Sequence, residues 1–457
     1  MAAPEPQAAS AVEDGLVLPL VLGLDGLRVQ VQGQADPLGL AAGVPGDRVK
    51  VRRIDRGRAE LARVVEPAAA RVPAPCPLLE SCGGCALQAM DYLAQLSAKT
   101  EALQAALEEL MPGGAVVDRV RPVVGLPRPF GFRTKLLMVT DPELSDGLRL
   151  GFYMRGTARR VVAAEGCPVQ HQQALAVLAT TRQLLEATGV RSAVEGPGGK
   201  SRGWLHAVGV RVDPATGRSE LTLSARNHRV PRGEALVQAL ARVPTVYGLH
   251  LCTAELRSSY PLEGPFTRLA GSRRVPFTVG GERFALSPGT FFQISADGAE
   301  LLVEQVLALL PGTIRLLADL YAGAGLFSVL AAGRWERALA VESSAAAVAD
   351  LSHRLEHTPL RGLTVHNERV ERCIGEVLEQ DPDVVLVDPP RVGCRPEVIE
   401  ALIAASPPTI LYVACGVTSF IEEARRLVAG GYTITEVRAV DLFAHTTHLE
   451  LVARFER

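Results

Sequence analysis

Residues 314–325, which read IRLLADLYAGAG, decide how the C-terminal part of this chain folds. An apolar run ends in Asp319 and Tyr321, and a turn that contains Gly323 and Gly325 follows it. This pattern is typical of a buried strand that leads through a tight turn into a helix, where the backbone lets a ligand approach. Glycine turns of this kind can also serve only helix–strand packing, so the turn alone does not identify a ligand.

The chain after residue 325 repeats this alternation of strand and helix. Four more apolar runs each lead into a helical pattern, and two last strand-like runs, 432–443 and 448–456, follow one another without a helix. Apolar strands that alternate with helices predict a parallel sheet with helices on both faces. We therefore expect a Rossmann-like α/β domain over residues 286–457, with an antiparallel pair at one edge.

Two further units precede this domain. Residues 12–68 alternate short strand-like runs with turns, which predicts a five-stranded barrel of OB type. Residues 69–285 mix strand-like runs with a helical stretch near 170–187 and predict an α+β middle domain. Leucines at helical spacing predict a helix over 87–111 that packs on the C-terminal domain and ends at Pro112-Gly113-Gly114.

The composition limits the functions open to the chain. Of its 457 residues 47% are hydrophobic and 21% are charged, and the formal net charge is -2. No apolar run reaches the roughly 18 residues of a membrane-spanning helix. Residues 1–15 lack the basic start and the apolar core of a secretory signal. We expect a disordered N-terminal tail, a cytoplasmic monomer and no membrane partner.

Basic residues concentrate in three runs before residue 165. Any one such run would ordinarily be a solvated charged face, but three in the front half of the chain favour an RNA-binding surface. The runs are Arg48, Lys50, Arg52, Arg53, Arg56, Arg58 and Arg63; Arg119, Arg121, Arg128, Arg133 and Lys135; and Arg149, Arg155, Arg159 and Arg160.

An acidic residue, Glu342, ends the second strand of the predicted sheet, about 20 residues after the glycine turn. A carboxylate in this place can accept hydrogen bonds from ribose hydroxyls. The spacing fits either a dinucleotide or S-adenosylmethionine. Phosphate binding would favour a third glycine at the position of Ser328, so the residues favour S-adenosylmethionine, which carries no phosphate.

Three residues at the ends of the later strands are candidates for chemistry. Asp388 starts the sequence DPPR after the fourth strand, and Cys415 ends the fifth, so both should face the same crevice. Taken singly, Asp388 could belong to an ordinary turn, and Cys415 could be a small core residue. Together they suggest a thiolate nucleophile for an electron-poor ring. Glu450 on the last strand could serve as a base, because half-burial raises the pKa of a carboxyl group.

Four of the eight cysteines are arranged as metal or cluster ligands. Three crowd into residues 76–85 around Gly83-Gly84, and the fourth precedes Pro168. A set of four cysteines suits zinc or a [4Fe–4S] cluster. Zinc sites usually contain two pairs, so three clustered cysteines and a remote one favour iron–sulfur. The four are Cys76, Cys82, Cys85 and Cys167.

With these residues the chain resembles, over almost its whole length, the RNA 5-methyluridine methyltransferases, and in particular the iron–sulfur ribosomal RNA type. The resemblance implies that residues 12–68 form a TRAM domain that binds RNA and that the four cysteines hold a [4Fe–4S] cluster. Ser287-Pro288-Gly289-Thr290-Phe291-Phe292-Gln293 looks like the segment whose Gln contacts S-adenosylmethionine. The implied cofactor contacts are Gln293, Tyr321, Gly323, Gly325, Glu342 and Asp388.

The resemblance also implies a reaction. A methyl group passes from S-adenosylmethionine to carbon 5 of a uridine, most simply in 23S ribosomal RNA. Cys415 is then the nucleophile, Glu450 the general base, and Asp388 the residue that orients the base or the nucleophile. Two alternatives remain: a methyltransferase that acts on another RNA position, on transfer RNA or on protein, and an RNA-binding protein whose methyltransferase domain is inactive.

Three positions depart from the pattern of the family. Gly416-Val417 follows the cysteine where the family usually has Asn-Pro, and Ser295 stands two residues after Gln293 in place of Asn. Thr134 replaces the Asn of an Arg-Asn-Lys motif. Each change removes a side-chain amide. Because the residues of the chemistry are kept, we expect activity with altered substrate positioning.

Overall fold

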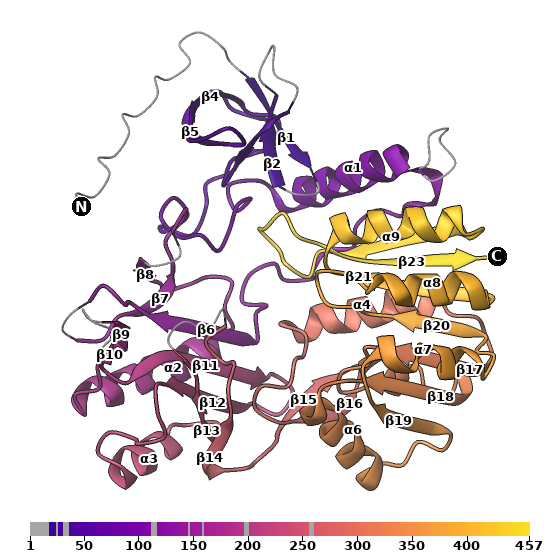
Figure 1. Cartoon of the computed structure of the whole chain (residues 1–457). Coiled ribbons are helices and arrows are strands. Elements are labelled where there is room, and N and C mark those ends of the chain that lie inside the picture. Colours follow the sequence, from indigo (N-terminus) through magenta and orange to yellow (C-terminus); the bar gives the residue numbers. More distant parts are fainter. Residues whose placement is uncertain are drawn as a thin grey trace, which may run out of the picture.

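The computed structural model describes residues 18–23, 26–30, 36–110, 117–144, 147–157, 160–195, 201–255 and 260–457. Within these, a barrel, a middle unit and a C-terminal α/β unit follow one another along the chain (Figure 1). The predicted N-terminal tail, the predicted helix end at Pro112-Gly113-Gly114 and Arg159 lie outside the described residues.

Five strands of the N-terminal unit form a closed barrel in the order β1-β2-β3-β5-β4. Alternation in β4 turns Val49 and Val51 inward, so the charged neighbours face outward. Buried Asp47 accepts hydrogen bonds from the backbone nitrogens of Val44 (3.1 Å) and Ala68 (2.9 Å), which fixes the barrel to the segment after it. The strands are β1 Leu18–Gly23, β2 Gly26–Val29, β3 Leu38–Leu40, β4 Arg48–Arg53 and β5 Arg58–Glu66.

The middle unit is a seven-stranded sheet in the order β14-β13-β12-β11-β6-β7-β8. All neighbours are antiparallel except β12 and β13, which are parallel. Apolar residues of α2 and α3 share one core with the sheet. The elements are β6 Lys135–Thr140, β7 Leu150–Tyr153, β8 Val161–Ala163, α2 Gln172–Ala187, β11 Leu205–Asp213, β12 Arg218–Ala225, α3 Glu234–Ala241, β13 Val246–Thr253 and β14 Phe266–Gly271, with the short pair β9 Val194–Glu195 and β10 Ser201–Arg202 and the 3-10 turn η1 Val117–Arg119 beside them.

The C-terminal unit is a seven-stranded sheet in the order β19-β18-β17-β20-β21-β23-β22. The strands are β17 Ile314–Leu320, β18 Trp335–Glu342, β19 Leu363–Asn367, β20 Val384–Val387, β21 Thr409–Ala414, β22 Thr433–Val440 and β23 Glu450–Glu456. Strand β23 is inserted antiparallel between β21 and β22. The predicted parallel sheet with a final antiparallel pair is therefore confirmed.

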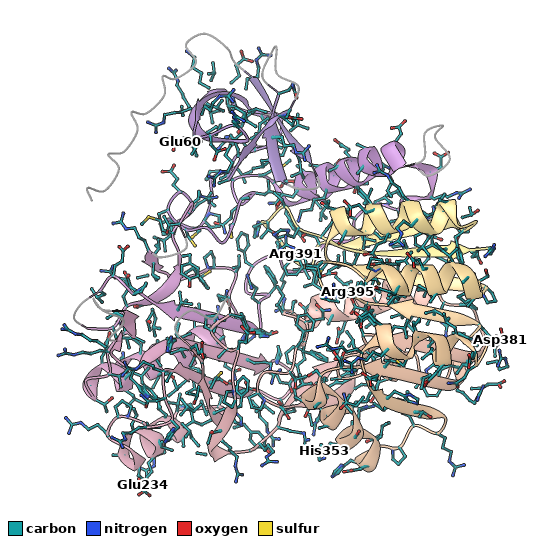
Figure 2. The ribbon with its side chains drawn as sticks, in the orientation of Figure 1. Glu60, Glu234, His353, Asp381, Arg391 and Arg395 are labelled. Carbon is teal, nitrogen blue, oxygen red and sulfur yellow. The ribbon has the colours of Figure 1, made fainter. Side chains whose placement is uncertain are left out.

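Helices cover both faces of this sheet, as predicted. One core contains α7, α8 and α9, and the other contains α4, α5 and α6. The carboxyl edge of the sheet, where Arg391 lies, faces the barrel and the middle unit, whereas Asp381 lies at the opposite edge (Figure 2). The helices are α4 Ala296–Leu309, α5 Leu326–Leu330, α6 Ala345–His357, α7 Val370–Leu378, α8 Pro396–Ala405 and α9 Val417–Ala429.

A hairpin of β15 (Val275–Val279) and β16 (Glu282–Leu286) precedes the predicted start of the C-terminal domain at residue 286. Its Phe277 and Phe284 are fully buried in the same core as α4. The hydrophobic core of the C-terminal unit thus includes residues that precede the predicted domain boundary at residue 286.

Helix α1 (Tyr92–Leu110) lies between the barrel and the C-terminal sheet (Figure 1). Leu103 and Leu107 enter the core of the sheet, while Ala102 enters the core of the barrel. The helix begins five residues later than predicted, because Asp91 accepts a hydrogen bond from the backbone nitrogen of Ala94 (3.1 Å) and caps it. Among the described residues, no helix is both long and apolar enough to cross a membrane.

Candidate active site

The glycine turn after β17 is hydrogen-bonded to Glu342, the acidic residue that ends β18. The backbone nitrogen of Gly323 donates a hydrogen bond to Glu342 (2.9 Å), and that of Ser344 donates another (2.5 Å). Tyr321, at the start of the turn, has φ 62°. Gly325 has φ 82°, and a β carbon there would lie 2.7 Å from Leu351, so this position requires glycine. The turn and the carboxylate form one rigid wall at the carboxyl edge.

The segment that contains Gln293 packs against the same edge, and Gln293 is 8% exposed. Asp350 on α6 holds this segment, because it accepts hydrogen bonds from the backbone nitrogen of Ser287 (2.7 Å) and the hydroxyl of Thr290 (2.8 Å). Asp350 could not be predicted from the sequence, since an acidic residue in a helix has no feature that separates it from a solvated charge.

Two of the three family departures have structural roles here. Ser295 is the N-cap of α4 and accepts a hydrogen bond from the backbone nitrogen of Gly298 (3.1 Å). Thr134 donates hydrogen bonds to the carbonyl oxygen of Ile294 from its backbone nitrogen (2.8 Å) and its hydroxyl (3.1 Å). Both residues hold the Gln293 segment through a hydroxyl group rather than an amide.

A hollow of about 440 Å³ opens beside Tyr321 at this edge. It is lined by residues that follow four neighbouring strands, namely Arg369 after β19, Ser343 after β18, Tyr321 after β17 and Pro390 after β20. A nucleoside could enter here next to Glu342, as ligands do at the carboxyl edge of open α/β sheets.

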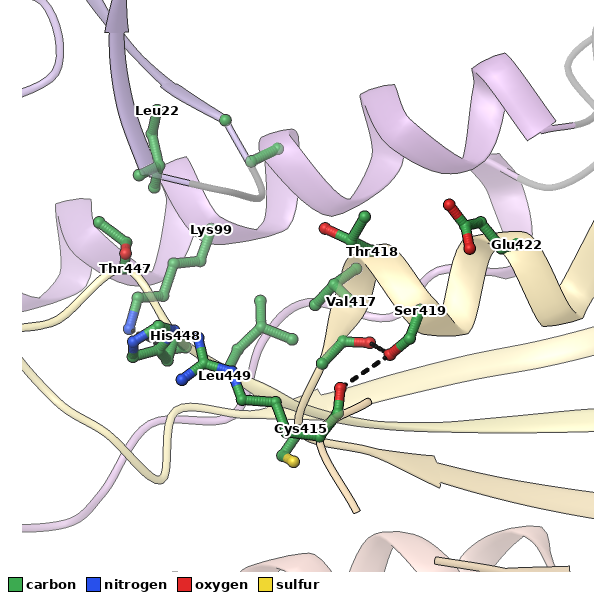
Figure 3. Close-up of a pocket in the computed structure, with 14 residues that line it drawn as sticks. Leu22, Lys99, Cys415, Val417, Thr418, Ser419, Glu422, Thr447, His448 and Leu449 are labelled. Carbon is green, nitrogen blue, oxygen red and sulfur yellow. Dashed lines mark hydrogen bonds between the residues drawn. The ribbon is translucent and has the colours of Figure 1, made fainter. Parts of the chain in front are cut away.

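A second cavity, of about 390 Å³, lies where the barrel, α1 and the C-terminal sheet meet. Cys415, at the end of β21, is in its wall (Figure 3). The wall is lined by Leu22 and Gly23 of the barrel, Lys99 and Ala102 of α1, and Arg391, Cys415, Gly416, Val417, Thr418, Ser419, Glu422, Thr447, His448 and Leu449. Lys99 and His448 are not predicted from the sequence, and Arg391 is seen there only as part of the DPPR motif.

The three candidate catalytic residues lie close enough to affect one another's ionisation. Burial, together with the carboxyl groups of Glu450 and Asp388, raises the pKa of Cys415 to about 11. Burial and then Asp388 raise the pKa of Glu450, which is 5% exposed, well above its usual range. Burial raises the pKa of Asp388 to about 8, with contributions from Asp319 and Glu342. Asp388 is therefore close both to the carboxyl groups of Asp319 and Glu342 and to the thiol of Cys415.

Gly416, the residue after the cysteine, lies against the backbone of Arg391. The hydroxyl of Ser419 donates hydrogen bonds to the carbonyl oxygens of Gly416 (2.9 Å) and Arg391 (3.1 Å), as Figure 3 shows. A β carbon at Gly416 would lie 2.4 Å from the carbonyl oxygen of Arg391. The glycine at this departure is thus required by the close approach of two backbones.

The four clustered cysteines gather in one place, and none of them is in a disulfide. Burial, together with the nearby thiols of Cys167, Cys82 and Cys76, raises the pKa of Cys85 to about 12. In the part of the chain that the structure describes, only His353, Glu356 and His357 form a trio of candidate metal ligands within 4.8 Å of one another. No three of the cysteine sulfurs are therefore as close as that.

Two of the arginines predicted to face RNA instead accompany these cysteines. Arg155 donates hydrogen bonds to the carbonyl oxygens of Leu79 (2.6 Å) and Cys85 (2.8 Å). Arg133 is partly buried beside Cys167 and Cys85. Other members of the basic runs form surface ion pairs, such as Arg48 with Glu66 (3.3 Å). The basic front half is therefore less available to RNA than its sequence suggests.

Comparison with known proteins gives consistent results. A model of the family described as tRNA (Uracil-5-)-methyltransferase matches residues 279–457. An uncharacterized RNA methyltransferase of Gloeobacter violaceus is 34% identical over 447 residues, which cover 96% of this chain and 95% of that protein. An uncharacterized RNA methyltransferase of Halalkalibacterium halodurans is 29% identical over 429 residues, which cover 90% of each.

The fold also matches a crystal structure. The tRNA (uracil-54, C5)-methyltransferase of Pyrococcus abyssi, solved in complex with S-adenosyl-L-homocysteine, has a TM-score of 0.74 at 22% identity. The match covers 96% of this chain and 99% of that one. The chain therefore belongs to the RNA methyltransferase family and is an S-adenosylmethionine-dependent enzyme of the uracil-5 type.

Proposed function

We propose that Cys415 forms a covalent bond to carbon 6 of a uridine in RNA while carbon 5 is methylated, with Glu450 as the general base. The observation that carries this proposal is the closeness of Cys415, which lines the cavity between the barrel and the C-terminal sheet, to Asp388 and Glu450 at the ends of the strands that pair with β21 on either side. Gln293, Tyr321, Gly323, Gly325, Glu342 and Asp388 are the residues that would hold S-adenosylmethionine, which supplies the methyl group.

Cys415, Asp388 and Glu450 suit the separate steps of this reaction. Carbon 5 of uracil is a weak nucleophile until a thiolate adds to carbon 6 and the electron pair of the ring moves to the oxygen on carbon 4. Because the pKa of Cys415 is about 11, its thiol must first lose a proton. Asp388 is the candidate acceptor, since its pKa of about 8 leaves part of it ionised near neutral pH.

Proton removal completes the reaction. Once carbon 5 carries the methyl group, Glu450 takes the remaining proton from carbon 5. The electron pair of that carbon–hydrogen bond restores the ring double bond, and the bond between sulfur and carbon 6 breaks. Cys415 leaves as a thiolate and recovers its proton from Asp388, while Glu450 releases its proton to water.

The target uridine has to leave its base stack to reach Cys415. Leu22 and Gly23 of the barrel and Lys99 of α1 line the same cavity as Cys415, so RNA would run between the barrel and the C-terminal sheet. The closed order of five strands supports a TRAM domain of OB type, whose outward-facing basic residues would hold the flanking nucleotides.

The four cysteines are proposed to hold a [4Fe–4S] cluster. A single zinc ion in tetrahedral coordination holds its sulfurs about 3.8 Å apart, as a Zn–S bond of about 2.3 Å requires. No three of the four sulfurs all lie within 4.8 Å of one another, which suits a larger cluster, and Arg133 and Arg155 would offset its negative charge. The role of the cluster is structural, because the reaction needs no electron transfer.

Ribosomal RNA, specifically 23S, is the proposed substrate, because the cysteine set resembles that of the iron–sulfur ribosomal enzymes. The Pyrococcus abyssi protein of the same fold is named for a transfer RNA position, which makes transfer RNA the alternative. Mapping of 5-methyluridine in both RNAs, with and without this gene, separates them: loss of the modification from 23S RNA supports the proposal, and loss from transfer RNA refutes it.

The covalent mechanism is tested with Cys415→Ala and labelled S-adenosylmethionine. The variant should transfer no methyl group to RNA, whereas Cys373→Ala, buried in α7 away from the cavity, should remain active. Turnover by Cys415→Ala would refute the mechanism. For the cluster, anaerobically purified protein should contain about four irons, as expected for a single [4Fe–4S] centre; stoichiometric zinc would refute it.

A further inference from the structure

The loop before Glu450 forms one wall of the Cys415 cavity. Glu450 pairs with Val440 across strands β22 and β23, so residues 441–449 close this hairpin. Thr447, His448 and Leu449 of the loop line the cavity. The course of the loop therefore determines where the strand that carries Glu450 begins.

Lys99 on α1 contacts both ends of this loop. Its Nζ donates hydrogen bonds to Oδ1 of Asp441 (2.5 Å) and to the carbonyl oxygen of His448 (2.9 Å). The side chains of Lys99 and Asp441 are 1% and 0% exposed. A buried ion pair is weak evidence for stability, because well-packed apolar residues often replace it without loss. Its position beside the cavity suggests a different role.

The middle of the loop is held by the segment that follows Cys85. The carbonyl oxygen of His445 accepts hydrogen bonds from the backbone nitrogens of Ala86 and Leu87, both at 2.9 Å. The backbone nitrogen of His445 donates to Oε1 of Gln95 on α1 (3.2 Å). His445 has φ 66°, a conformation that residues other than glycine rarely adopt. Contacts from outside the loop therefore maintain its conformation.

We propose that Lys99 is a positioning residue for the general base: it joins the two ends of loop 441–449 so that Glu450 meets the proton on carbon 5. This inference rests on the proposed function. Lys99 acts through the backbone of the loop, since the groups that shift the pKa of Glu450 are its burial and Asp388. Addition of Cys415 and methylation of carbon 5 do not use Glu450, so only the last step should depend on Lys99.

The test is a variant that stalls at this last step. Lys99→Met should lower kcat about 100-fold, as displacement of a catalytic group by about 1 Å can do. Because the affected step follows the irreversible methyl transfer, KM should fall with kcat, and kcat/KM should change by less than about 3-fold. On a denaturing gel, RNA bonded to the protein and carrying the labelled methyl group should accumulate. An unchanged kcat, or loss of turnover without this adduct, would overturn the inference.

A second variant keeps the test valid if Lys99→Met folds poorly. Lys99→Met with Asp441→Asn removes both buried charges, so no carboxylate is left unpaired in the interior. It should still accumulate the methylated adduct, because the contact with the carbonyl of His448 remains absent; recovery of the original kcat would refute the positioning role.

Glu450→Gln tests the proposed methylation mechanism separately from the positioning role of Lys99. This variant should accumulate the methylated adduct whether or not Lys99 matters. If it stalls and the Lys99 variants do not, the positioning role is wrong and the proposed function stands. If Glu450→Gln itself gives no adduct and turns over normally, the proposed function fails as well.

Discussion

The α carbon of Gly416 faces the carbonyl oxygen of Arg391 so closely that a β carbon would lie 2.4 Å from that oxygen and 2.9 Å from Oγ of Ser419. The departure at Gly416 is therefore part of how this protein packs the residue after its cysteine against the loop that follows Asp388.

Gly416→Ala should consequently displace the Arg391 loop. We expect a loss of stability of about 1–3 kcal/mol, as overpacking generally causes, together with a lower kcat. Thermal denaturation and methyl transfer measure the two effects. Gly375→Ala is the matched control, because a β carbon at that helical position meets nothing within 4 Å. A Gly416→Ala protein as stable and active as the unaltered one would contradict this account.

Asp388→Asn should make the thiol of Cys415 more reactive. The carboxyl group of Asp388 contributes to the raised pKa of Cys415, so its removal lowers that pKa from about 11. At pH 9, where Asp388 with its pKa of about 8 is mostly ionised, alkylation of Cys415 by iodoacetamide should be faster in the variant. Mass spectrometry of the Cys415 peptide gives the rate, and the Cys373 peptide is the internal control. A slower reaction would contradict the electrostatic coupling.

Glu450→Gln should stabilise the protein in alkaline solution. A carboxyl group whose pKa is raised on folding favours the folded state while it is protonated, and this contribution is lost as the pH rises through the raised pKa. The melting temperature of the variant should therefore exceed that of the unaltered protein at pH 9. The difference should shrink toward pH 4, near the ordinary pKa of glutamate. A constant difference across this range would show that ionisation is not its cause.

Arg155→Leu should weaken the proposed cluster site without touching a cysteine. The guanidinium group holds the carbonyl oxygens of Leu79 and Cys85 and also reaches Ala41 of the barrel (2.5 Å). Iron should be lost to a chelator several-fold faster than from the unaltered protein, as followed by absorption near 400 nm. Arg160→Leu removes an exposed ion pair with Glu143 and is the control. Equal rates would exclude a role of Arg155 at the cluster.

The sequence predicts the part of the site that strand order determines. Asp388 and Cys415 end neighbouring parallel strands, and apolar runs of strand length identify such strands, so their meeting at one edge could be predicted. Lys99 could not be found in this way, because its partner Asp441 is 342 residues further along the chain. The basic runs gave no sign that Arg133 and Arg155 turn toward the cysteines, since a run of charges does not indicate which members are buried.

Helix α1 has a consequence for how the protein folds and how it could be divided. Its side chains complete two hydrophobic cores at once, that of the barrel through Ala102 and that of the C-terminal sheet through Leu103 and Leu107. A chain that lacks the barrel would expose Ala98 and Ala102 of α1 to water, and a chain that lacks α1 would open both cores. The barrel and the C-terminal sheet should therefore unfold in a single cooperative transition. The barrel is thus an integral part of the enzyme and would not survive as a detachable module.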